Sequence, residues 1–190
     1  MIPEGVTRIG AGAFWGTGLT SIEIPNGVTS IGDNAFYCSS LTSVVISEGV
    51  RTIGETAFRG CSSLTSITIP SSVISIRSGA FQECDNLTSV TVMNPLPVSI
   101  SRYTFENRAN ATLYVPKGSK EAYETADYWK EFKEIIEMEV DEIEDVREKE
   151  PGMAEAATVY DLNGRRLTQK QQGVNIIRTK DGKSRKVLVK

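Results

Sequence analysis

A repeat of 22 or 23 residues constrains this chain more than any other feature. Copies begin at Ile2, Ile24, Ile46 and Ile69, and a degenerate fifth copy begins at Val92. A fixed period of this length is typical of solenoid proteins, in which one repeat cannot bury its apolar face without its neighbours. The repeat therefore predicts an elongated stack of coils around one continuous core.

The apolar residues keep the same places in every copy. Each copy ends in alternation, with Ile22 and Ile24 facing inward in the first, as in a short β-strand. The inward columns are Leu19, Leu41, Leu64 and Leu87, then Ile22, Val44, Ile67 and Val90, then Ile24, Ile46, Ile69 and Val92. A stack of Phe14, Phe36, Phe58, Phe81 and Phe105 is expected on the opposite side. We predict a β-rich solenoid with a continuous sheet of parallel stacked strands and short helical turns.

These motifs, C-x-x-L-x-x-I-x-I-P followed by V-x-x-I-G-x-x-A-F, closely resemble the Treponema-type repeat of BspA-like bacterial surface proteins. The resemblance covers residues 2 to 116. It implies a leucine-rich-repeat solenoid on a secreted or cell-surface bacterial protein that acts in adhesion and protein binding.

The two ends of the array differ. Residues 116–140 are expected to cap it with a helix, for which Ser119 is the N-cap, and a final strand over residues 136–140. The apolar face of that helix is Ala122, Tyr123, Ala126, Trp129 and Phe132, and the inward strand residues are Ile136, Met138 and Val140. At the N-terminal end we expect an open strand edge, which indicates a fragment of a longer protein. The solenoid is assigned to residues 1–140.

The tail is expected to contain a linker and a small domain. Residues 141–155 are acidic and include Pro151 and Gly152, whereas residues 156–190 predict a small antiparallel β domain with turns at Asn163-Gly164 and Asp181-Gly182. This last segment resembles the C-terminal sorting domain of type IX secretion in Bacteroidetes, with Asn175 where tyrosine is usual. The resemblance implies export to the outer surface and contact with the secretion machinery.

Composition argues against several classes of function. The chain has no histidine and its acidic residues are scattered, so we predict no catalytic residues, no metal, no cofactor and no enzymatic activity. Residues 1–116 carry 8 acidic and 6 basic residues, a net charge of -2, which disfavours nucleic-acid binding. No apolar run reaches the roughly 18 residues of a transmembrane segment, and no signal peptide is expected at the start of this sequence.

Three cysteines, Cys38, Cys61 and Cys84, lie three residues before a leucine of the repeat. We expect them to stack as free, buried thiols. Parallel side chains in neighbouring coils would keep the Cβ atoms too far apart for a disulfide, and one row of thiols cannot supply a zinc tetrahedron.

Two surfaces are candidates for ligand binding. The first is the concave face of the sheet, with the outward residues Ser21, Ser43, Ser66, Ser89 and Thr112, and then Glu23, Val45, Thr68, Thr91 and Tyr114. Small hydroxyl side chains there are equally explained by crowding on a curved inner face. The second is a rim patch of Trp15 and Tyr37, which marks either an interface or packing on the turns. We expect the ligand to be a host protein or glycan; the alternatives are a structural spacer without a ligand and an enzyme of unpredicted type.

Overall fold

The computed structural model describes residues 2–3 and 5–138, together with the strands at 141–144, 158–160, 166–167, 173–178 and 184–189. The chain divides into two compact units, Met1–Met138 and Glu139–Lys190. The first unit contains the repeats. The predicted division into residues 1–140, 141–155 and 156–190 stays a prediction.

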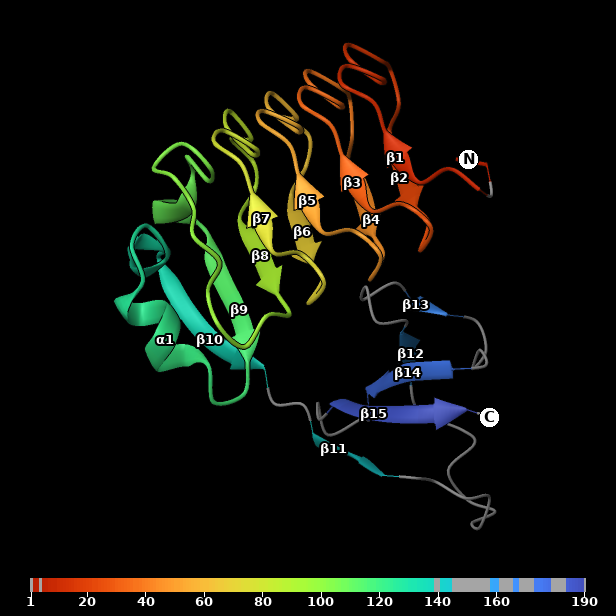
Figure 1. The fold of residues 1–190 in the computed structure, drawn as a ribbon. Coiled ribbons are helices and arrows are strands. Elements are labelled where there is room, and N and C mark those ends of the chain that lie inside the picture. The colour runs from red at the N-terminus through yellow and green to blue at the C-terminus, as the bar shows by residue number, and fades with distance from the viewer. Residues whose placement is uncertain are drawn as a thin grey trace. The chain divides into compact units, whose positions relative to one another are not determined.

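The first unit is a parallel β-solenoid, as predicted. One side of each coil is a strand of four or five residues, and these long strands line the inner side of the curve (Figure 1). They are β2 (Ser21–Ile24), β4 (Ser43–Ile46), β6 (Ser66–Ile69), β8 (Ser89–Val92), β9 (Thr112–Pro116) and β10 (Glu134–Met138). Every ladder among them is parallel.

The long strands do not form one continuous sheet, so that part of the prediction is wrong. β2 pairs with β4, and a separate sheet has the order β10-β9-β8-β6. The break coincides with a change in the preceding loop. Four residues lie between Phe36 and Leu41 in the second coil, but five lie between Phe58 and Leu64 in the third.

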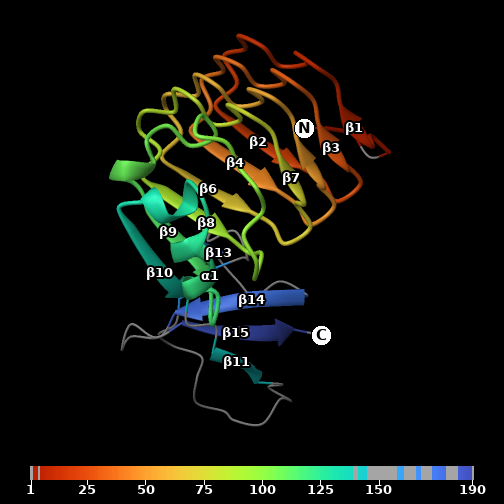
Figure 2. The same cartoon turned by 60° about the vertical axis from the view of Figure 1, so that its left-hand side comes forward.

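A second ladder of two-residue strands runs along the other side of the coils (Figure 2). Its members are β1 (Arg8–Ile9), β3 (Ser30–Ile31), β5 (Thr52–Ile53) and β7 (Ser75–Ile76), all in parallel register. The isoleucine of each is buried between the two ladders. The sequence placed a returning segment there but no strand, because two residues per copy give no visible alternation.

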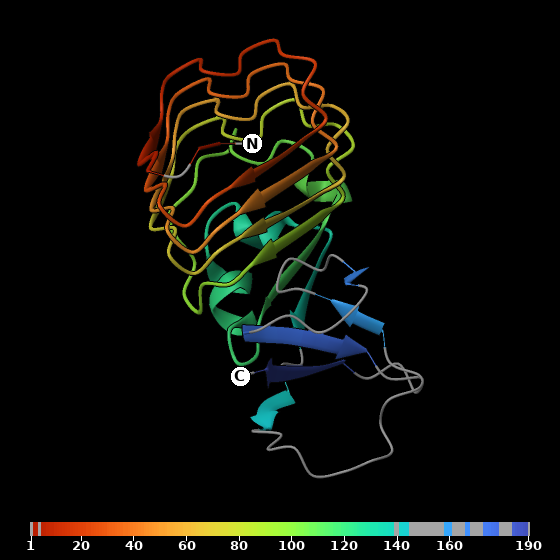
Figure 3. The same cartoon turned by 90° about the vertical axis from the view of Figure 1, so that its right-hand side faces the viewer.

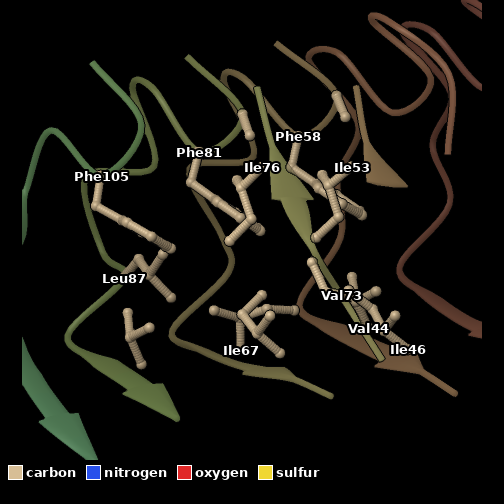
Figure 4. Packing of buried hydrophobic residues seen from close by; sticks show 14 of the residues in the cluster. Val44, Ile46, Ile53, Phe58, Ile67, Val73, Ile76, Phe81, Leu87 and Phe105 are labelled. Atoms are coloured by element: carbon tan, nitrogen blue, oxygen red, sulfur yellow. The ribbon is translucent and has the colours of Figure 1, made fainter. Parts of the chain in front are cut away.

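The core between the ladders contains the predicted phenylalanine stack (Figure 4). From Phe14 to Phe105 the ring centroids are 4.9–5.2 Å apart, and neighbouring ring planes differ by at most 6°. The inward columns are buried from the second coil onward, whereas Leu19 and Ile22 of the first coil are half-buried. Each coil thus buries the apolar side chains of its neighbour by packing its own equivalent side chains against them.

Left-handed residues precede and follow each Ala-Phe pair of the four good repeats. They are Gly12, Asn34, Thr56 and Gly79 before it, and Gly16, Cys38, Gly60 and Glu83 after it. At Gly60 a Cβ atom would lie 2.9 Å from Cys38 Sγ, so glycine provides both the backbone conformation and the space for its neighbour. These turns also aim the Phe36 N–H at Ala57 O, 2.7 Å away.

The three cysteines do not form one buried row. Cys38 has φ of 51° and is exposed, and Ser39 takes the buried place, with its Oγ 3.3 Å from Cys61 Sγ. The second coil has the shorter loop between its phenylalanine and its leucine. Equivalent loop residues in different coils are therefore found by aligning the phenylalanines and not the leucines. The predicted stacking and burial of Cys38 are therefore wrong.

Cys61 and Cys84 are free and buried, as predicted. Each thiol donates to a phenylalanine carbonyl of the preceding coil, Cys61 to Phe36 O at 3.3 Å and Cys84 to Phe58 O at 3.1 Å. The hydrogen bond with Cys61 and then burial raise the pKa of the Cys84 thiol. Each of these carbonyls also accepts a backbone N–H, from Ser39 and Cys61 respectively, so the thiol is its second donor.

After β9 the chain forms α1 (Lys120–Thr125), shorter than predicted. The helix ends before Ala126, which is extended, and a left-handed Tyr128 leads into the 3-10 turn η2 (Trp129–Glu131); an earlier turn, η1, covers Arg108–Asn110. Ser119 precedes the helix as expected, but its side chain makes no capping hydrogen bond. Glu137 Oε1 of β10 accepts from the Lys120 N–H instead, at 3.0 Å.

Two aromatic rings beyond the helix reach the end of the phenylalanine stack. The rings of Trp129 and Phe132 lie 5.5 and 5.7 Å from that of Phe105. The helical prediction over residues 119–132 is wrong beyond Thr125, because the chain continues as an extended Ala126, a left-handed Tyr128 and a 3-10 turn. β10 also begins two residues earlier than predicted, so that Ile135 faces the core and Ile136 does not. The capping role of this segment stays a prediction, and Val140 lies outside the described residues.

Replacing Tyr123 with phenylalanine is expected to lower the free energy of unfolding by about 1–2 kcal/mol at neutral pH, since its buried hydroxyl donates to Asn94 O at 2.9 Å. Burial raises the pKa of Tyr123. The stability that the protonated Tyr123 hydroxyl contributes is therefore fully present below the pKa of tyrosine in the unfolded chain, about 10. It is lost as the pH rises through the higher pKa of the folded state. Urea denaturation should show a weaker decline above about pH 10 in the variant. The exposed Tyr103→Phe is the control, and an unchanged alkaline decline would contradict this reasoning.

The second unit contains β11 (Asp141–Glu144), β12 (Thr158–Tyr160), β13 (Arg166–Leu167), β14 (Gly173–Arg178) and β15 (Ser184–Val189). The strand order is β11-β15-β14-β12-β13, with antiparallel ladders from β12 to β15. β11 pairs in parallel with β15 and lies within the range 141–155 that was assigned to the linker. Its acidic sequence has no alternation, but ladder bonds need only the backbone.

Both predicted turns of the tail, Asn163-Gly164 and Asp181-Gly182, lie outside the described residues. Asn175 belongs to β14. Throughout the described part of the chain, no helix combines the length and the hydrophobicity that crossing a bilayer requires.

Candidate ligand-binding surface

The long strands run side by side in Figure 3, and strand alternation places the ten predicted residues on one face of them, here called the strand face. Ladder register places Ser21 beside Ser43, and Glu23 beside Val45. Beyond the break, the two columns continue as Ser66, Ser89 and Thr112, and as Thr68, Thr91 and Tyr114. The structure therefore gathers all ten residues into two rows that run along the coils.

The strand face becomes less exposed toward its C-terminal end. Ser21, Glu23, Ser43 and Ser66 are exposed, while the six remaining residues are half-buried. Hydroxyl groups in such rows both donate and accept hydrogen bonds, and their short side chains leave the backbone approachable. This arrangement can hold a polar ligand over several coils.

Sequence analysis missed the last members of both columns. Glu134 pairs with Thr112, and Ile136 pairs with Tyr114, which extends the strand face onto β10. The signal was the alternation of residues 134–138, but it was assigned to a strand that began at Ile136 with the opposite orientation. Tyr114 and Ile136 give the C-terminal end of the face an apolar character that the middle lacks.

The predicted rim patch is part of a longer row of side chains, here called the rim row. The ring of Trp15 meets that of Tyr37 edge-on at 5.3 Å, with 64° between their planes. The guanidinium of Arg59 lies over the Tyr37 ring at 5.5 Å and pairs with the Glu83 carboxylate at 2.6 Å. The hydrogen bond from Arg59 lowers the pKa of Glu83 and keeps the carboxylate ionised.

Arg59 and Glu83 were not predicted as members of this patch. Arg59 follows Phe58 as Trp15 follows Phe14 and Tyr37 follows Phe36, so the repeat itself contained the signal. It was overlooked because this column changes chemical type from coil to coil, unlike the inward columns.

The described residues contain no group of three histidine, cysteine, aspartate or glutamate side chains that could hold a metal ion. Five ion pairs are present among them, and their acidic members are all partly exposed. The chemistry that the two surfaces display is hydrogen bonding and aromatic contact.

The repeats match a family model described as the BspA-type leucine-rich repeat region, over residues 1–112 and in six copies. This chain belongs to that family. Six copies exceed the four good repeats and one degenerate repeat that the sequence predicted.

Two solved structures are similar to this BspA-type chain. One is a leucine-rich cell-surface protein from Faecalibacterium prausnitzii, with 28% identity, a TM-score of 0.49, and coverage of 72% of this chain and 31% of that protein. The other is a leucine-rich-repeat protein from Bacteroides ovatus, with 21% identity, a TM-score of 0.44, and coverage of 73% and 47%. The chain thus spans less than half the length of either. No curated protein matches the chain.

Proposed function

We propose that this BspA-type repeat array is the binding module of a secreted or cell-surface bacterial protein and mediates adhesion to a host protein or glycan through its strand face. The observation that carries this proposal is the pair of rows on that face. Ten side chains from five coils point the same way in register, and most are short and uncharged. Repeat proteins commonly use such an extended surface for binding.

The middle of the strand face favours a ligand that forms hydrogen bonds without a net charge. Thr68 and Thr91 are neighbours in register, and Ser66 and Ser89 lie beside them. A charged ligand would find no opposite charge in these four positions. A peptide backbone or a neutral sugar offers the matching donors and acceptors.

Replacing both Thr68 and Thr91 with arginine is expected to reduce adhesion at least about tenfold, because two long cations would cover the middle of the rows. Binding can be measured on immobilised extracellular-matrix proteins and on a glycan array. The matched control replaces Thr52 and Ser75, which are also half-buried register neighbours but lie on the short strands. Adhesion that survives the Thr68 and Thr91 changes would defeat the binding model and favour a structural spacer.

We further propose that residues 156–190 direct export, through the secretion machinery that recognises type IX sorting domains. The support is the resemblance of VYDLNGRRL and of the basic end of the chain to those domains. Deleting residues 156–190 from the full protein is expected to abolish its display on the outer surface, measured by antibody labelling of whole cells. Undiminished labelling would contradict the proposal.

A further inference from the structure

The two tryptophans of the chain have opposite environments. Trp129 is 1% exposed and its Nε1 donates to Val98 O at 2.8 Å, whereas Trp15 is 62% exposed. Leaving an indole in water gives up the favourable transfer free energy that its burial would provide. The position of Trp15 in the repeat does not require an aromatic residue, since the equivalent residues are Tyr37, Arg59, Gln82 and Glu106. The fold therefore does not explain Trp15.

The turn fixes the backbone of Trp15 and places its indole close to Gly12. Trp15 N–H donates to Gly12 O at 3.1 Å, and the ring atom Cε3 lies 3.8 Å from the point where a Cβ on Gly12 would be. The edge contact with Tyr37 restrains the ring from the next coil. An aromatic surface that is fixed before a ligand arrives loses little conformational entropy on binding.

The rest of the rim row is polar but balanced in charge. Arg59 and Glu83 are partly exposed and neutralise each other at 2.6 Å, so an anionic ligand would have to displace Glu83 to reach the guanidinium. Arg59 Nε is buried without a hydrogen-bond partner, so hydroxyl groups would meet the terminal guanidinium nitrogens of Arg59 and the acceptors of Glu83. A neutral polyhydroxyl ligand fits this pair better than a phosphate or a carboxylate does.

The size of the aromatic surface favours a glycan over a protein as the partner. One indole and one phenol offer at most about 150–250 Å² each, well below the roughly 800 Å² that each side of a stable protein interface buries. The area is sufficient for one or two sugar rings. A pyranose presents C–H groups on its face, which suit the negative face of an aromatic ring, and hydroxyls at its edge.

We propose that the rim row is a glycan-binding subsite, in which a neutral pyranose stacks on Trp15 and the adjoining sugar forms hydrogen bonds with Arg59 and Glu83. It is separate from the strand face and extends the proposed binding function to a second surface. A contact of this size binds weakly, with a Kd of about 1 mM. Several copies on a cell surface would raise the avidity.

The indole N–H signals in an NMR spectrum test this proposal directly, since the chain has two tryptophans. The probes are cellohexaose and chitohexaose, which are neutral β-linked sugars, and a proline-rich peptide. Either sugar is expected to shift the Trp15 signal saturably and leave the Trp129 signal in place. Trp15→Ala should weaken binding at least about tenfold, with binding to this variant followed by the sugar's own NMR signals, and its unchanged Trp129 signal would show that the core is intact.

Two control variants locate the subsite. Tyr103→Ala removes an exposed aromatic outside the rim row, and the arginine changes at Thr68 and Thr91 alter only the strand face; both should bind the sugars as the wild type does. The proposal is overturned if neither sugar shifts Trp15 at about ten times the expected Kd. It is also overturned if only the peptide shifts Trp15, or if binding survives Trp15→Ala. Loss of sugar binding in the Thr68 and Thr91 variant alone would place the glycan on the strand face.

Discussion

Replacing Phe58 with alanine is expected to lower the free energy of unfolding by about 3–5 kcal/mol. Phe58 is fully buried, and its ring stacks between Phe36 and Phe81 at centroid distances of 5.0 and 5.2 Å. Removing it leaves a cavity in the middle of the stack that neighbouring coils cannot fill, because their backbones are fixed by ladder bonds. Urea denaturation followed by circular dichroism measures the change.

Phe14→Ala is the matched control for this prediction. Phe14 ends the same stack with one aromatic neighbour and is only half-buried, so the loss should be clearly smaller. Equal losses for Phe14 and Phe58 would show that the stack does not behave as a series of neighbour contacts.

Replacing Gly54 with alanine is expected to destabilise the solenoid by about 2–3 kcal/mol, because the new methyl group has no space. Its Cβ would lie 2.5 Å from Gly32 C and 2.6 Å from Asp33 N, which are backbone atoms of the preceding coil. Relief would require the two coils to move apart. Thermal and urea denaturation should both report the loss.

Gly10→Ala tests the same position of the repeat without the clash. Gly10 follows Ile9 as Gly54 follows Ile53, but an added Cβ would meet no atom within 4 Å. Its effect should stay within about 0.5 kcal/mol. Comparable destabilisation by both changes would mean that the glycine is needed for its backbone freedom and not for close packing of coils.

The part of the fold that the sequence predicted best is the part where all copies agree. Isoleucine, valine and phenylalanine recur at fixed positions because each must contact its equivalent in the next coil. The positions that repeat in the sequence are therefore also the positions that are buried in the structure. The prediction was wrong where a copy departs from the others. Cys38 was aligned on Leu41, and the missing residue in its loop moved Ser39 into the buried place.

Tertiary contacts explain the other errors. The segment from Ser119 to Phe132 has helical periodicity, but its helix ends at Thr125, and Trp129 and Phe132 pack on Phe105 from the segment beyond it. On the candidate surfaces, the strand face followed from alternation alone. Arg59 and Glu83 did not, since a salt bridge between unlike residues of two coils leaves no repeating pattern in the sequence.

The interruption between β4 and β6 has a mechanical consequence. Within the described residues, the long strands of every other neighbouring pair are joined by a backbone ladder, while these two are adjacent without one. Under tension along the stack, we expect the coils to separate first at this joint, where side-chain packing and the hydrogen bonds of Glu48 with Ser71 and Ser72 resist on that side without a backbone ladder. The stack would then yield reversibly at one seam, because the Phe36–Phe58 contact and the β3–β5 ladder keep the coils attached.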